Sequence, residues 1–184
     1  MRPYYFPKAY ADLVARLRVP SGFLLAAAFA WFAAPSAASL FWGLPVCVLG
    51  LALRAWAAGH LEKNQRVISS GPYAYTRNPL YLGTYAVAMG LALAARRWEL
   101  AALFTTVFLL VYLPVMELEE QHLRKLFPGY AEYAGRVPLL APRLGGDGGA
   151  GPFRWATYRK NEEYNAAIGF AIGYALLAWR AFGG

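Results

Sequence analysis

The chain has few of the side chains that build soluble catalytic centres. Among its 184 residues are one cysteine, two histidines and only 15% charged residues. Cys47 has no partner for an intramolecular disulfide, and His60 and His122 are too few to make a zinc site with it. The two aspartates, Asp12 and Asp147, both lie in polar segments, which argues against a Ser-His-Asp triad. No metal site is therefore expected.

Apolar residues are abundant instead. Hydrophobic residues make up 59% of the chain and aromatic residues 16%, whereas soluble domains are roughly 45–50% apolar and about 25% charged. The net charge of +8 would suggest a nucleic-acid partner in a soluble protein. In a membrane protein it more often reflects Lys and Arg facing anionic lipid at the cytoplasmic surface. The expected partner is therefore a lipid bilayer and not nucleic acid.

Five apolar stretches are long enough, or nearly so, to cross a hydrocarbon core of about 30 Å. They are Val19–Ala34, Ala38–Gly59, Pro79–Ala95, Trp98–Met116 and Asn165–Phe182. The first is the weakest and is interpreted either as a short span or as a re-entrant half of a hairpin. The N-terminus lacks a signal-peptide pattern, so no cleavage is expected. The sequence predicts an all-α, polytopic integral membrane protein with about five transmembrane helices and a cytoplasmic interfacial helix and loops.

The positive charges predict an orientation. Of the 18 Lys and Arg residues, 14 lie in the N-terminal segment, in 60–78 or in 117–163. The connections on the other side carry Arg96, Arg97 and Arg180, and Arg54 lies inside the second span. The positive-inside rule therefore places the N-terminus and the active site in the cytoplasm.

The chain is expected to form one membrane domain over residues 1–184. Its predicted parts are an N-terminal helical hairpin (1–59), the core motifs (60–142), a linker and interfacial segment (143–163) and a C-terminal helix (164–184). Gly146–Gly151 matches the dinucleotide pattern G-x-G-x-x-G, but no βαβ unit surrounds it, so Gly145–Gly151 is interpreted as a flexible linker. Gly169 and Gly173 have the spacing of close helix contacts, expected within the chain.

Two polar segments hold the groups that could do chemistry. The first ends at Asn78-Pro79, a favoured N-cap and first helical residue, which on the plain interpretation only starts the third span. Alternatively, the unpaired N–H groups of that helix start bind an anionic ligand group. The second segment continues the fourth helix past Pro114 as an amphipathic interfacial helix. A Glu120–Arg124 pair on its exposed face is the structural alternative to a functional Glu120.

Three sequence blocks resemble a known superfamily. They are GPYAYTRNPLYLG at 71–83, the pair Glu119-Glu120, and FPGYAEY at 127–133 followed by Arg136-Val137-Pro138. Together they resemble the isoprenylcysteine carboxyl methyltransferase and phospholipid methyltransferase superfamily of integral-membrane enzymes, over roughly residues 40–142. The resemblance implies a helical membrane fold whose cytoplasmic motifs enclose S-adenosylmethionine, while a lipophilic acceptor enters between helices.

The resemblance also implies site residues. The implied cofactor-binding residues are His60, Gln65, Arg66, Val67, Ile68, Tyr73, Arg77, Asn78, Pro79, Leu80, Tyr81 and Glu119, and the implied substrate-binding residues are Glu120 and Tyr130. No catalytic residue is assigned.

Two positions depart from the isoprenylcysteine pattern. Asn78 stands where a His is usual, and Leu113–Met116 lacks the Arg that meets the substrate carboxylate. Because the Trp98–Met116 span holds no other Lys or Arg, the acceptor is expected to present a neutral or amine nucleophile, such as a phospholipid amine.

Two other functions are weighed against the methyltransferase. NADPH-dependent sterol or enone reductases share a similar C-terminal Arg-x-Pro-x-Tyr-x-Gly motif and a related helical core, but they are generally longer and carry more basic residues. A non-catalytic membrane protein would leave the cytoplasmic motifs without a reason. The methyltransferase is therefore the favoured prediction.

Overall fold

The computed structural model describes residues 5–143, 145 and 151–183, and the regular elements in this part of the chain are helical. The predicted all-α membrane fold is confirmed. The elements are α1 (Lys8–Phe32), α2 (Ala37–Ala58), a 3₁₀ turn (Gly71–Ala74), α3 (Pro79–Ala94), α4 (Trp98–Val107), a π-helical turn (Phe108–Tyr112), α5 (Leu113–Leu126), α6 (Tyr130–Arg136), α7 (Trp155–Lys160) and α8 (Tyr164–Phe182).

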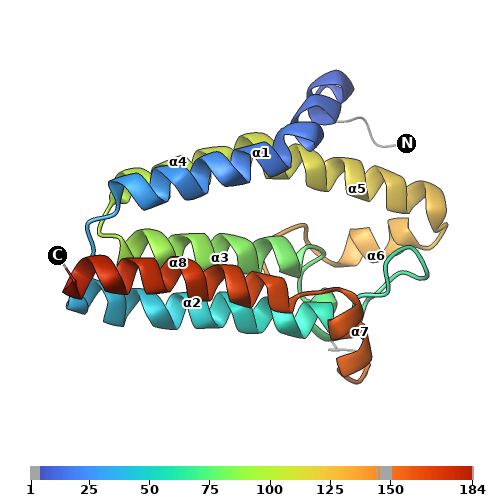
Figure 1. The fold of residues 1–184 in the computed structure, drawn as a ribbon. Coiled ribbons are helices and arrows are strands. Elements are labelled where there is room, and N and C mark those ends of the chain that lie inside the picture. The colour runs from blue at the N-terminus through green and yellow to red at the C-terminus, as the bar shows by residue number, and fades with distance from the viewer. Residues whose placement is uncertain (1–4, 144, 146–150, 184) are drawn as a thin grey trace.

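The long helices form a multi-pass membrane bundle in two layers, with α1 and α4 above α2, α3 and α8 (Figure 1). By length and apolarity α1, α2, the continuous helix Trp98–Leu126 and α8 can each cross a membrane, and α3 is a shorter apolar helix. Trp31, Trp42, Trp98 and Trp179 lie exposed near the helix ends at the C-terminal end of the bundle. Tryptophans collect at membrane interfaces, so this end is one interface.

The first helix begins earlier than predicted. The predicted apolar span Val19–Ala34 forms only the second part of this helix, because α1 begins at Lys8 and contains Pro20. Hydropathy excluded the charged first turns from the span, although Ala11 and Val14 on these turns are buried. Proline removes one helical hydrogen bond, which membrane helices tolerate at a kink. The first part of α1 is accordingly bent away from the bundle (Figure 1).

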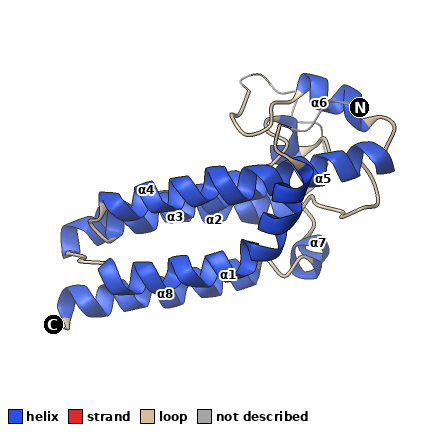
Figure 2. Ribbon diagram, turned by 90° about the horizontal axis from the view of Figure 1, so that it is seen from above, coloured by secondary structure: helices blue, strands red, loops and turns tan. Residues whose placement is uncertain are grey.

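The fourth span continues past Pro114, as predicted. The π-helical turn joins α4 to α5, which extends beyond the bundle together with α6 and α7 at the end opposite the C-terminus (Figure 2). The predicted linker Gly145–Gly151 lies mostly outside the described residues.

Glycines allow α2 and α3 to pack closely. A Cβ at Gly50 would lie 2.7 Å from the Gly83 carbonyl oxygen, and one at Gly43 would lie 2.6 Å from the Gly90 carbonyl oxygen. Such small residues let two membrane helices approach backbone to backbone. Gly169 and Gly173 do not serve this purpose, because a Cβ at either would meet nothing within 4 Å. The expected within-chain contact at those two glycines is therefore wrong.

Substitution of Gly50 tests this packing. We expect Gly50→Ala to lower the free energy of unfolding by about 1–3 kcal/mol, because the added methyl group meets backbone that cannot move aside cheaply. Gly169→Ala is the matched control and should be neutral or stabilising by about 0.5–1 kcal/mol, since alanine favours helix and the site is open. Unfolding by titration with denaturing detergent measures both. Equal effects of the two substitutions would contradict the assigned helix contact.

The apolar core lies at the C-terminal end of the bundle. Phe29 of α1, Leu40 of α2, Leu100 of α4 and Leu177 of α8 are buried there in one cluster with small residues of α3. Along the bundle α1 packs on α4 and α5, whereas α2 packs on α3 and α8. The sequence motifs lie at the opposite end, where α5, α6 and α7 extend beyond the bundle (Figure 2).

Candidate active site

A cavity of about 980 Å³ lies at that end of the bundle, between α1, α2, α3, α5, α6 and the loop after α2. Small-molecule sites typically measure roughly 300–1,000 Å³. Nine of the residues implied by the resemblance line it: Arg66, Val67, Ile68, Tyr73, Arg77, Leu80, Tyr81, Glu119 and Tyr130. His60, Gln65, Asn78, Pro79 and Glu120 are not among its lining residues.

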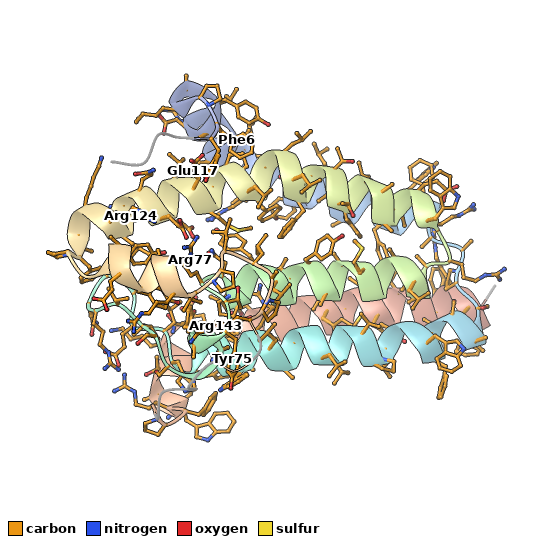
Figure 3. All side chains as sticks on the ribbon, turned by 180° about the vertical axis from the view of Figure 1, so that it is seen from behind. Phe6, Tyr75, Arg77, Glu117, Arg124 and Arg143 are labelled. Atoms are coloured by element: carbon orange, nitrogen blue, oxygen red, sulfur yellow. The ribbon has the colours of Figure 1, made fainter. Side chains whose placement is uncertain are left out.

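Backbone contacts bring the two separated motifs together. The Arg77 N–H donates to the Pro138 carbonyl at 3.0 Å, and the Tyr133 hydroxyl donates to the Tyr73 carbonyl at 2.8 Å. Arg143 reinforces the contact: its N–H donates to the Tyr75 carbonyl at 3.0 Å (Figure 3). The motifs at 71–83 and 127–138 therefore form one unit around the cavity, although 43 residues separate them in the sequence.

The start of α3 opens toward the cavity. Asn78 occupies the N-cap position and Pro79 the first turn, as predicted, but no side chain caps this helix. The expected capping role of Asn78 is wrong, because its amide donates to the Leu139 carbonyl at 3.2 Å. Leu80 and Tyr81 of the same first turn line the cavity. Uncapped N–H groups and the positive end of the helix dipole favour an anionic ligand group here.

The two neighbouring glutamates have different environments. The Glu119 side chain is 50% exposed and lines the cavity, where it accepts a hydrogen bond from the Tyr81 hydroxyl at 2.9 Å and lies 3.6 Å from Arg18. Such an exposed ion pair contributes little to the stability of the fold. The Glu119 carboxylate is therefore open to a cationic ligand group.

Glu120 is a buried partner of Arg77. Their side chains are 13% and 9% exposed, and Arg77 Nε lies 2.6 Å from the carboxylate in an ion pair without hydrogen-bond alignment. Arg77 also donates to the Ala134 carbonyl at 2.5 Å, and Figure 3 shows it between α5 and the helices below. The Glu120–Arg124 alternative is wrong, because Arg124 lies over the Tyr130 ring instead.

Three tyrosines at the motif contact have buried, neutral phenols. Burial raises the pKa of the phenols of Tyr73, Tyr130 and Tyr133, and the carboxylate of Glu120 raises that of Tyr130 further. The Tyr130 hydroxyl donates to Glu120 at 3.3 Å. These phenols therefore keep their protons at physiological pH and do not act as bases.

His60 supports the fold beside the cavity. Its ring nitrogens lie 2.8 Å from the Trp56 and Gly151 carbonyl oxygens. Gly71 has a φ of 58°, and a Cβ there would lie 2.7 Å from His60 Nε2. Gly71 of the first motif therefore leaves the space that the His60 imidazole occupies. Gln65 lines a smaller neighbouring pocket.

Sequence reasoning missed two arginines of the cavity. Arg18 of α1 and Arg54 of α2 both line it, whereas the Trp98–Met116 span contributes no Lys or Arg, as expected. Arg54 Nε lies 2.5 Å from Glu163, which directly precedes α8. A charge inside an apolar span is itself a sign of function, and that signal could have identified Arg54.

The fold and the cavity define a helical, multi-pass membrane protein with a cavity of small-molecule size between its helices. The chain belongs to the phospholipid methyltransferase family, whose model matches residues 22–129. The match runs from α1 to the residue before α6 and includes most of the motif residues at the cavity.

Two curated relatives have names from metal resistance. The chain is 35% identical over 107 residues to the cobalt-zinc-cadmium resistance protein CzcN of Cupriavidus metallidurans, covering 55% of this chain and 50% of the relative. It is 32% identical over 111 residues to the nickel-cobalt-cadmium resistance protein NccN of Alcaligenes xylosoxydans xylosoxydans, covering 59% and 52%. The chain thus spans about half the length of these relatives. No solved structure matches it significantly.

Proposed function

We propose that the protein is an S-adenosylmethionine-dependent methyltransferase that acts on a lipophilic acceptor at the membrane surface. The observation that carries the proposal is the cavity, which places the open Glu119 carboxylate and the uncapped start of α3 among tyrosines of both motifs. Membership of the phospholipid methyltransferase family supports the same chemistry.

The lining residues fit the cofactor's separate groups. Glu119 would bind the ammonium group, because it is the half-exposed carboxylate of the cavity. The first N–H groups of α3, with Arg77 nearby, would bind the carboxylate. Tyr73 and the chain at Arg66–Ile68 would enclose the adenine, where a flat ring favours aromatic neighbours. When bound, the cofactor supplies a methyl group on a sulfonium.

The protein's own part in such a reaction is positioning and exclusion of water. Methyl transfer is an in-line displacement, which fixed geometry and a dry site accelerate. Tyr130 and Tyr133 hold the α6 wall of the cavity through their contacts with Glu120 and Tyr73. No side chain is assigned as a general base, and the acceptor is proposed to carry a neutral or amine nucleophile.

The reductase alternative fits the cavity less well. Five Lys and Arg residues line it: Arg18, Arg54, Lys63, Arg66 and Arg77. Four of them have carboxylate partners within 4.0 Å: Glu119, Glu163, Glu62 and Glu120. NADPH carries several phosphate charges, which would need several unpaired cations close together, whereas a single anionic group needs only one receptive arginine.

Methyl transfer itself is the test. Purified protein in detergent, supplied with methyl-labelled S-adenosylmethionine and a total lipid extract, should transfer label to a lipid-soluble product. Glu119→Ala should transfer at least tenfold less at a cofactor concentration below saturation. Label that stays in the aqueous fraction in both samples would contradict the proposal.

We also propose that the motif end of the bundle faces the cytoplasm, since 14 of the 18 Lys and Arg residues lie on that side. Cys47 is buried, so the labelling of a single introduced cysteine can be measured without a contribution from Cys47. We expect Ser69→Cys to react with an impermeant reagent only after the cells are opened, and Gly184→Cys to react in intact cells. Labelling of both from the same side would contradict the topology.

A further inference from the structure

The membrane side of the cavity carries an arginine that no assigned role uses. Arg54 lies four residues before the end of α2, about one helical turn below the surface of the bundle. Its Nη1 donates to the Leu80 carbonyl at 3.3 Å and to the Thr84 hydroxyl, and its Nε contacts Glu163. Among the described residues, Nη2 has no hydrogen-bond acceptor.

The surrounding residues keep this guanidinium in place. A Cβ at Gly83 would lie 2.6 Å from Arg54 Cγ, so only glycine leaves room for the side chain along α3. The carboxylate of Glu163 is 9% exposed and balances the charge while the cavity is empty, which makes a charge at this depth tolerable. Arg54 therefore has a fixed position, and its Nη2 is available to a ligand.

An apolar surface of α1 lines the same cavity. Ala15, Val19 and Gly22 follow helical spacing and all belong to its lining. Val19 is 61% exposed, and α1 packs on α4 and α5 while Arg54 lies in the other layer. A hydrocarbon chain can thus lie along α1 while its polar end reaches Arg54.

We propose that Arg54 binds the anionic group, a phosphate or a carboxylate, of the lipophilic acceptor, and that Glu163 is its positioning residue. This inference rests on the proposed function and adds a substrate subsite to it. Arginine suits such a group because its planar fork offers paired donors to two oxygens. Glu163 lies outside the family match, which ends at residue 129. The segment leading into α8 thus contributes to the acceptor site.

Binding of three short-chain probes tests the proposal. Dioctanoyl phosphatidic acid carries a phosphate, decanoic acid a carboxylate, and dioctanoylglycerol no charge. Affinities for the full-length protein in neutral detergent are measured by native mass spectrometry. We expect one of the acids to bind at least tenfold more tightly than dioctanoylglycerol, and the stronger acid identifies the anionic group.

The variants separate an anion receptor from a structural ion pair. Arg54→Gln should remove the preference for the acid. Glu163→Gln should keep or increase it, because the amide oxygen can still accept the hydrogen bond that positions Arg54 while the competing negative charge is removed. Arg18→Gln changes the exposed arginine of the same cavity and should keep the preference for the acid. If Arg54→Gln does not stay monodisperse, Arg18→Gln serves as the test instead. No preference in the wild type, a preference that survives Arg54→Gln, or one lost with Arg18→Gln would overturn the proposal.

Cofactor binding is measured in the same samples. If S-adenosylmethionine fails to bind while the acid preference depends on Arg54, the anion subsite stands and the methyltransferase proposal fails. If the cofactor binds and the wild type shows no acid preference, only the Arg54 inference fails.

Discussion

Glu120→Ala should lower the free energy of unfolding by about 3–5 kcal/mol, because it leaves the guanidinium of Arg77 buried without its counter-charge. The two side chains are only 13% and 9% exposed, so water cannot replace the lost partner. Arg77→Ala should cost a similar amount, since it strands the carboxylate and removes the hydrogen bond to the Ala134 carbonyl. Titration with denaturing detergent in mixed micelles measures both.

A double variant and an exposed pair serve as controls for this prediction. Arg77→Met with Glu120→Met should recover most of the lost stability, because an apolar pair of similar size has no charge to desolvate. Glu132→Ala, at a position 77% exposed and 3.5 Å from Arg136, should cost about 0–1 kcal/mol. Wild-type stability of Glu120→Ala would show that Glu120 and Arg77 do not meet in the folded protein.

The second large effect concerns cofactor affinity. Glu119→Ala should weaken S-adenosylmethionine binding roughly 10–150-fold. This range corresponds to the free energy of about 1.5–3 kcal/mol that a hydrogen bond to a charged group contributes. The folded protein should stay monodisperse, because the partners of Glu119 are Tyr81 and an exposed Arg18. Calorimetry on the purified variant measures the affinity.

Glu132→Ala is also the control for cofactor binding and should leave the affinity unchanged. Glu117 is less suitable, because its carboxylate accepts hydrogen bonds from the N–H groups of Tyr5 and Phe6 at 2.6 and 3.1 Å and so holds the start of α1 on α5. Figure 3 shows Phe6 beside Glu117. Unchanged affinity in Glu119→Ala would leave Glu119 as a solvated side chain.

The sequence predicted the features that depend on local composition. Apolar length located the five helices, and the alternation after Pro114 located the helical continuation in α5. Hydropathy misplaced the start of α1, because helical periodicity and not apolarity continues through Lys8, Arg16 and Arg18. The bounds of a span and the bounds of its helix are therefore different quantities.

The pairing of charges could not be predicted from the sequence. Glu120 has an arginine four residues away on its own helix, the usual partner for a helical ion pair. Instead it pairs with Arg77, because burial of the motif contact excludes water from both side chains. Arg54 and Glu163 are 109 residues apart, and only the packing of α8 against α2 brings them together.

Binding of three adenosine-containing ligands to the detergent-purified protein tests the central claim most directly. Calorimetry compares S-adenosylmethionine, S-adenosylhomocysteine and NADPH under identical conditions. The account predicts saturable binding of the first two, weakened by Glu119→Ala and unchanged by Glu132→Ala, with no binding of NADPH. Binding of NADPH alone would identify a reductase, and binding of none of the three would contradict a cofactor role for the cavity.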